Sequence, residues 1–174
     1  MPAAGPWDLV VGHSLGGAVA VKTAAADPGW TKSVLLIDPV LVVAEDRHDD
    51  LIATLRGDLD NLDPAALLSA HPRWHLEDAV QKVNAARVAS PYLVERTVRD
   101  NPDWQLEEAA AGLQPRTRAL AGDPALDASF PVTLAERIAA RNPRFTFVVV
   151  DGAGHSVHRD DPDRVVAEAL ALLP

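Results

Sequence analysis

The sequence predicts an α/β protein with a mostly parallel sheet of about four strands, flanking helices and a helical cap insertion. Short β-branched runs alternate with helical spacing at both ends of the chain, which favours parallel strands covered by helices. The middle, about residues 46–113, has helical spacing and few β-branched runs. A chain of 174 residues suits one domain, residues 1–174, with one sizeable core.

Four segments have the composition of buried parallel strands, which are short, apolar and bounded by glycine, proline or aspartate. They are residues 7–11, 33–38, 117–122 and 145–150. Helical spacing outside the insertion covers residues 15–26, 131–141 and 161–172. Within the insertion it covers residues 49–60, 64–69, 75–86, 90–100 and 106–111, several with Asp, Ser or Pro in capping positions. We expect the insertion to lie over one end of the sheet.

The charge balance narrows the classes of partner. The formal net charge is −9, with 25 acidic and 16 basic residues, which argues against nucleic acid and against an anionic membrane surface. The chain has no cysteine, so disulfides, thiolate metal sites and a cysteine nucleophile are excluded. Residues 1–6 show no leader pattern, and no apolar run approaches the length of a membrane span. We therefore expect a cytoplasmic protein.

Ser14 is the expected nucleophile of a serine hydrolase. It is the central residue of Gly12-His13-Ser14-Leu15-Gly16, between a predicted strand and a predicted helix. The Gly-x-Ser-x-Gly pattern also occurs by chance, but this context gives it a structural meaning. A sharp strand-to-helix turn lifts the serine above the sheet, and the helix N-terminus favours negative charge there. The Leu15 N–H, directly after the serine, is the expected oxyanion donor.

A serine hydroxyl needs a base to take its proton. His155 follows the clearest strand in a glycine-rich loop, at the end of a parallel strand where such sheets place their chemistry. We expect it to be the base, with His13 supporting the turn and His158 facing solvent. The three remaining histidines fall in the insertion, where caps, turns and surface positions are the expected roles: His48, His71 and His75.

The base in turn needs a carboxylate to orient it. Asp123 follows a strand-ending glycine and is the first choice; Asp127, four residues on, is the second. Asp38 ends the strand after the serine turn and is the third. With Asp123 the chain order is Ser, Asp, His. No histidine pair has ligand spacing and no dinucleotide fingerprint is present, so we expect no metal and no cofactor.

Four motifs resemble α/β-hydrolase fold proteins of the esterase and lipase type. They are Val-Val-Gly-His-Ser-Leu-Gly-Gly at 10–17, Leu-Leu-Ile-Asp-Pro at 35–39, Ala-Leu-Ala-Gly-Asp-Pro at 119–124 and Gly-Ala-Gly-His-Ser at 152–156. The stretch at 71–74 resembles the cap of that family. The chain departs from it at Ala125, where many members carry the acid, and in starting close before the serine strand.

The resemblance implies a truncated α/β-hydrolase fold. The loop that supplies the second oxyanion N–H in the family has no counterpart, and losing one such donor costs about 10²–10³ in rate. The serine strand becomes an apolar edge, which invites pairing with another chain. We therefore expect a homodimer, in which two such edges pair antiparallel or the partner supplies the missing donor.

The expected activity is carboxylic ester hydrolysis through Ser14, His155, Asp123 and the Leu15 N–H, on short-chain esters. The alternative is a catalytically weak or inactive homologue that acts as a binding or interaction module. Acyl transfer, peptide or lactone hydrolysis and perhydrolysis use the same side chains, and the fold does not choose among them.

Overall fold

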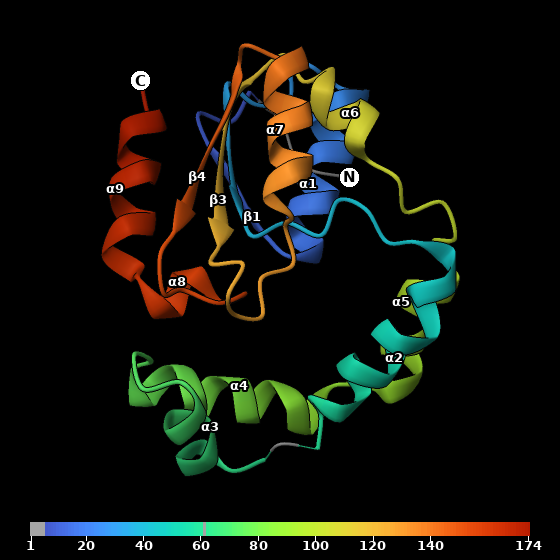
Figure 1. Cartoon of the computed structure of the whole chain (residues 1–174), viewed down its shortest axis with the longest axis vertical. Coiled ribbons are helices and arrows are strands. Elements are labelled where there is room, and N and C mark those ends of the chain that lie inside the picture. Colours follow the sequence, from blue (N-terminus) through green and yellow to red (C-terminus); the bar gives the residue numbers. More distant parts are fainter. Residues whose placement is uncertain (1–5, 61) are drawn as a thin grey trace. The chain divides into compact units, whose positions relative to one another are not determined.

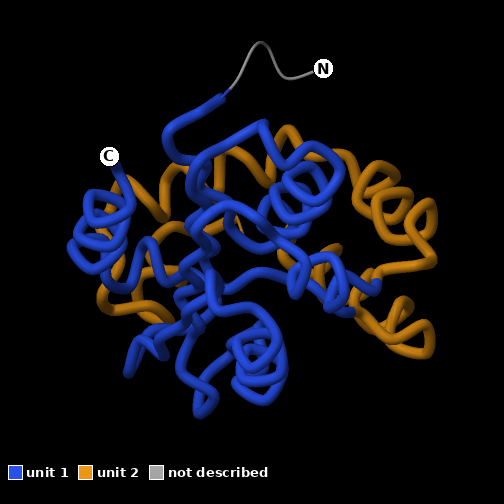
Figure 2. The backbone as a smooth tube through the Cα atoms, turned by 90° about the horizontal axis from the view of Figure 1, so that it is seen from above, with its two compact units in different colours: residues 1–42, 105–174 blue, residues 43–104 orange. Residues whose placement is uncertain are grey.

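The computed structural model describes residues 6–60 and 62–174, so the expectation of no leader segment concerns residues that lie largely outside the described part. The chain divides into two compact units, Met1–Val42 with Gln105–Pro174 and Val43–Trp104 (Figure 2). The first unit holds a sheet of four parallel strands, β1 (Val10–His13), β2 (Ser33–Ile37), β3 (Arg116–Gly122) and β4 (Phe145–Val150), in the order β1-β2-β3-β4. The expected fold class is confirmed.

Helices cover both faces of this sheet, as Figure 1 shows for α1, α7 and α9. On one face α1 (Leu15–Ala26), α6 (Glu107–Ala111) and α7 (Val132–Arg141) pack on Val34, Leu36 and their neighbours. On the other, α8 (Val157–Asp160) and α9 (Pro162–Leu172) pack on Leu35 and Ile37. Successive residues of a strand point to opposite faces, so β2, which is buried along its whole length, serves two cores.

The second unit is helical. It contains a short 3₁₀ turn (Glu45–Arg47), α2 (His48–Gly57), α3 (Pro64–Ala70), α4 (Leu76–Val88) and α5 (Pro91–Arg99). A small apolar cluster of Leu67, Trp74, Ala79 and Val83 joins α3 to α4. Proline in the first turn and a capping Asp63 or Ser90 start α3 and α5, as the capping pattern predicts.

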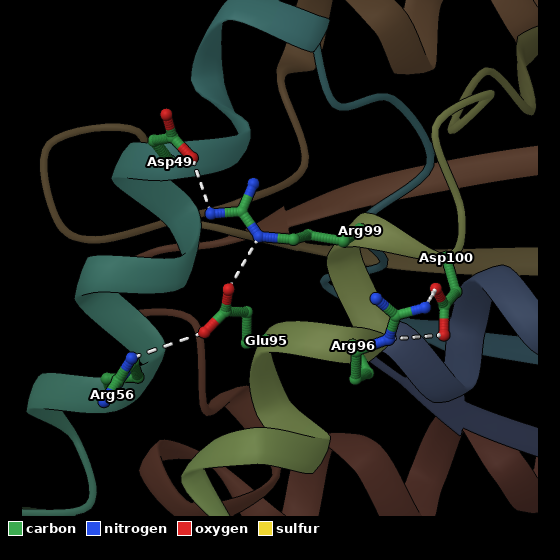
Figure 3. A network of polar contacts seen from close by, with 6 residues as sticks. All are labelled: Asp49, Arg56, Glu95, Arg96, Arg99 and Asp100. Carbon is green, nitrogen blue, oxygen red and sulfur yellow. Dashed lines mark hydrogen bonds and ion pairs between the residues drawn. The ribbon is translucent and has the colours of Figure 1, made fainter.

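An ion-pair network ties α2 to α5 (Figure 3). Arg99 contacts Glu95 at 2.7 Å and Asp49 at 3.2 Å, and Glu95 also reaches Arg56 at 3.4 Å. Arg96 pairs with Asp100 beside it. Most of these side chains remain substantially exposed, so salt screens the network and each pair adds little to stability.

The structure departs from the expected boundaries at two places. The first strand begins at Val10 rather than Trp7, which makes only an isolated bridge to Thr31. The helical unit ends at Trp104 rather than near residue 113, because α6 packs on α1 and α7 in the other unit. Glu107 and Glu108 of α6 pair there with Arg137 and Arg141 of α7, at 2.8 and 2.5 Å.

The edge of the sheet at β1 is apolar. Val11 on β1 is half exposed, and so are Leu15 and Val19 along α1.

Among the described helices, none has the length and hydropathy to cross a membrane.

Candidate functional site

Ser14 occupies a strained position between β1 and α1. Its φ of 53° lies in the left-handed region, which non-glycine residues adopt at a cost of about 1–3 kcal/mol. Its N–H donates to the carbonyl of Ile37, and its own carbonyl accepts from Gly17, Ala18 and Val40. The surrounding backbone therefore holds the strained turn that the sequence predicts for this serine.

Gly12 makes this turn possible. A Cβ at Gly12 would lie 2.6 Å from the carbonyl oxygen of Gly16, closer than real Cβ atoms approach. A Cβ at Gly16 would meet nothing within 4 Å. The two glycines of the motif are therefore not equivalent: only the first is required by the close approach of β1 to the start of α1.

The side chains of Ser14, His155 and Asp38 form a hydrogen-bonded triad, which is called the relay below. His155 Nε2 lies 2.9 Å from Ser14 Oγ, and His155 Nδ1 lies 2.7 Å from Asp38 Oδ2. His155 is carried by the loop after β4, and Asp38 directly follows β2. With Nδ1–H donating to the carboxylate, Nε2 is left as the acceptor for the serine proton.

Asp38 is fully buried and completely hydrogen-bonded. Its Oδ1 accepts the N–H groups of Gly122 and Phe130 at 3.0 and 3.1 Å, and its Oδ2 accepts that of Ser129 at 2.7 Å. Its φ is 37°, so both ends of the relay lie on left-handed backbone. Three backbone donors and one imidazole are arranged around the carboxylate and use its four lone-pair directions.

The position of the carboxylate corrects the sequence prediction. Asp123 does not reach His155; it accepts the N–H groups of Ala125 and Gly152 at 2.9 and 2.8 Å, and these bonds lower the pKa of its carboxyl. Asp127 binds the backbone N–H of His155 at 3.1 Å rather than its ring. The third choice, Asp38, faces the imidazole.

Sheet geometry explains this outcome. β1 and β2 are neighbours with His13 opposite Ile37, so the residues that follow these two strands end side by side. β3 lies one strand further from the serine, and strands are spaced about 4.8 Å apart. The signal available in the sequence was an aspartate directly after the apolar run at 34–37 and before a proline.

Aspartates also hold the loop that carries His155. Besides the bonds from Asp123 and Asp127, Asp160 accepts the N–H of Gly154 at 2.9 Å. The loop passes close over the end of β3, where a Cβ at Gly122 would lie 2.9 Å from the Gly154 carbonyl oxygen. Asp123 and Asp127 therefore hold the backbone of this loop, which begins at β4, three strands from β1, and brings His155 to the serine.

The other histidines occupy the kinds of position expected from the sequence, except for His158. The ring of His158 is half buried and lies 4.5 Å from that of His13, so the expectation that it faces solvent is wrong. His13 contacts the relay itself. In the helical unit, His75 caps α4 by accepting the Glu77 N–H, His71 stacks on Trp74 and His48 begins α2.

The helix N-terminus beside Ser14 offers N–H donors. Leu15 is the first residue of α1, where backbone N–H groups have no partner within the helix. Over residues 6–60 and 62–174, no acceptor contacts the Leu15 N–H. This donor directly follows the serine, as the sequence predicts, and is suited to an oxyanion formed on attack by Ser14.

The fold and these contacts define an α/β protein with a serine at a strained strand-to-helix turn, backed by a histidine and a buried carboxylate. The sequence matches the Alpha/beta hydrolase family over residues 3–169, and the chain belongs to that family.

Individual relatives show how much of a family member the chain spans. It is 40% identical to Lipase LipV of Mycobacterium tuberculosis over 57 residues, which are 33% of this chain and 22% of that protein. It resembles E-2-(acetamidomethylene)succinate hydrolase with a TM-score of 0.72 and 21% identity, covering 94% of this chain and 66% of that one. The esterase EaEST of Exiguobacterium antarcticum gives 0.67 and 18%, covering 92% and 64%. The chain thus spans about two thirds of these structures.

Proposed function

We propose that the protein is a serine hydrolase of carboxylic esters. The observation that carries this proposal is the relay from Ser14 through His155 to Asp38, with distances of 2.9 and 2.7 Å, on a serine held in a strained conformation. An activated serine whose base is oriented by a third group is the arrangement needed for acyl transfer. An esterase and a lipase among the similar proteins support ester substrates.

Three side chains and one backbone N–H have distinct roles in this mechanism. Ser14 Oγ attacks the ester carbonyl carbon while His155 Nε2 takes its proton, and Asp38 stabilises the imidazolium that forms. The Leu15 N–H donates to the oxyanion. His155 then gives the proton to the departing alcohol, which leaves an acyl group on Ser14. Water, deprotonated by the same histidine, releases the carboxylic acid and restores the serine.

We further propose a preference for short acyl chains. The small size of the helical insertion in the sequence motivates this preference. p-Nitrophenyl esters of increasing acyl length measure this preference directly. Falling kcat/KM beyond butyrate is the expected result, and a maximum at eight carbons or more contradicts it.

The activity itself is tested by labelling and turnover. A fluorophosphonate probe labels only an activated serine, so the wild-type protein is expected to react and Ser14→Ala is not. The matched control is Ser156→Ala, which removes the serine next to His155 and is expected to keep both labelling and turnover. Retained turnover in Ser14→Ala refutes the mechanism. A folded wild-type protein that neither labels nor turns over would favour the binding-module alternative.

A further inference from the structure

Three imidazoles lie in contact with one another, and one of them is the His155 ring of the relay. The ring of His13, the last residue of β1, has its centroid 4.7 Å from that of His155 and 4.5 Å from that of His158. All three rings are partly buried. His13 is also the covalent neighbour of Ser14, so one residue joins the nucleophile's strand to the loop that carries the base.

A hydrogen bond fixes which nitrogen of His13 carries its proton. His13 Nε2 lies 2.9 Å from the backbone carbonyl oxygen of His155. A carbonyl oxygen only accepts, so His13 must donate Nε2–H. The His13 ring therefore contacts His155 twice, at the His155 ring and at the His155 backbone carbonyl. Both contacts act on the residue whose ring must lie between Ser14 and Asp38.

The surroundings of His13 favour the neutral form of its ring. Burial lowers its pKa below 6.5, and the nearby charge of His155 lowers it further, outweighing the bond to the His155 carbonyl and the charge of Asp38. Arg159 of α8 adds a lowering charge, and His158 faces the ring from the same helix. Because His155 becomes cationic during acyl transfer, a neutral neighbour avoids charge repulsion at that step.

We propose that His13 is a positioning residue, which donates Nε2–H to the His155 carbonyl and packs on its ring to hold the imidazole in line between Ser14 and Asp38. The proposal rests on the proposed function, since positioning affects a rate only if His155 is the base. A base displaced by about 1 Å can lose 10²-fold in rate. The expected effect is therefore on kcat, with KM nearly unchanged.

Two substitutions separate the ring from the hydrogen bond. His13→Gln keeps an N–H donor and removes the ring and its titration, whereas His13→Phe keeps a ring and removes the donor. His13→Phe is expected to lower kcat about 10–100-fold with KM within about 3-fold, and His13→Gln is expected to recover part of that loss. His75→Gln, which alters a histidine that caps α4, is the control and is expected to keep wild-type kinetics.

The pH profile supplies a readout that a purely structural role does not change. In the wild type, protonation of His13 below its lowered pKa places a cation beside His155, so activity falls more steeply on the acid side than one titrating group allows. His13→Gln is expected to remove this additional acid loss. An unchanged acid limb in His13→Gln overturns the electrostatic part of the proposal.

Histidine ¹H–¹⁵N NMR tests the positioning without turnover. The wild type is expected to show neutral, Nε2-protonated His13 at pH 7.5 and a downfield Nδ1–H signal from His155 bonded to Asp38. In His13→Phe that downfield signal should weaken or shift, while thermal unfolding shows that the variant is folded. An unchanged signal with unchanged kcat refutes the positioning role. A changed signal in a protein whose wild type does not react with fluorophosphonate upholds the positioning and refutes the hydrolase.

Discussion

Replacing Asp38 by asparagine tests the assignment of the carboxylate. The substitution keeps the size of the side chain and removes its charge, so His155 loses the group that fixes its Nδ1–H tautomer and stabilises its cation. Loss of that function in a serine relay lowers kcat by about 10⁴, equivalent to about 5.5 kcal/mol of transition-state stabilisation. Asp123→Asn removes a carboxylate that binds only backbone N–H groups and is expected to cost less than about 10-fold.

The structure also predicts a stability cost for Asp38→Asn. Oδ1 accepts two backbone N–H groups, and Oδ2 accepts the N–H of Ser129 and Nδ1–H of His155. Whichever way the amide is turned, its NH₂ group must face two of these donors. Each donor left unsatisfied costs about 1–3 kcal/mol, so unfolding should become easier by about 2–6 kcal/mol.

Two assays on the same purified variants decide the matter. Hydrolysis of p-nitrophenyl acetate gives kcat/KM, and thermal unfolding followed by circular dichroism gives stability. Asp127→Asn is included because it alters the aspartate that binds the His155 backbone. The reasoning is refuted if Asp38→Asn loses less than 10-fold in activity while Asp123→Asn loses 10³-fold or more.

Three further predictions follow from single contacts. Gly12→Ala places a Cβ against the Gly16 carbonyl and should cost about 2–3 kcal/mol, lowering Tm by about 5–10 °C, whereas Gly16→Ala should stay within about 0.5 kcal/mol; equal Tm values would contradict this. The pKa of Glu168 is lowered. Burial raises this pKa, but the hydrogen bonds and charges of Arg118 and Arg164 outweigh the effect of burial. Its stabilisation, about 1–2 kcal/mol, is present above pH 4.5 and lost as pH falls through the lowered pKa, so urea unfolding of Glu168→Gln should differ from wild type at pH 7 and match it in acid. Light scattering is expected to give twice the 18.5 kDa monomer mass, and Val11→Lys on the exposed β1 edge is expected to restore the monomer; a wild-type monomer rules the dimer out.

Local sequence patterns predicted most of the secondary structure. The helices at Leu15–Ala26 and Pro162–Leu172 and the strand at Phe145–Val150 match the predicted segments, because apolar spacing, capping residues and β-branched runs act over neighbouring residues. The short α8 was missed, since its four residues carry too few positions for a periodic pattern. The sequence also did not predict that α6 belongs to the unit that contains the sheet, because its partners on α7 lie about 30 residues away in sequence.

The sequence by itself determined the serine turn and the histidine loop, since both are local arrangements of glycines around one functional residue after a strand. It did not determine which aspartate meets the histidine. Three aspartates follow strands or lie in the loops after them, and only the order of the strands places Asp38 next to Ser14 while Asp123 and Asp127 hold the loop backbone. That choice depends on distances across the sheet, which the spacing of residues along the chain does not encode.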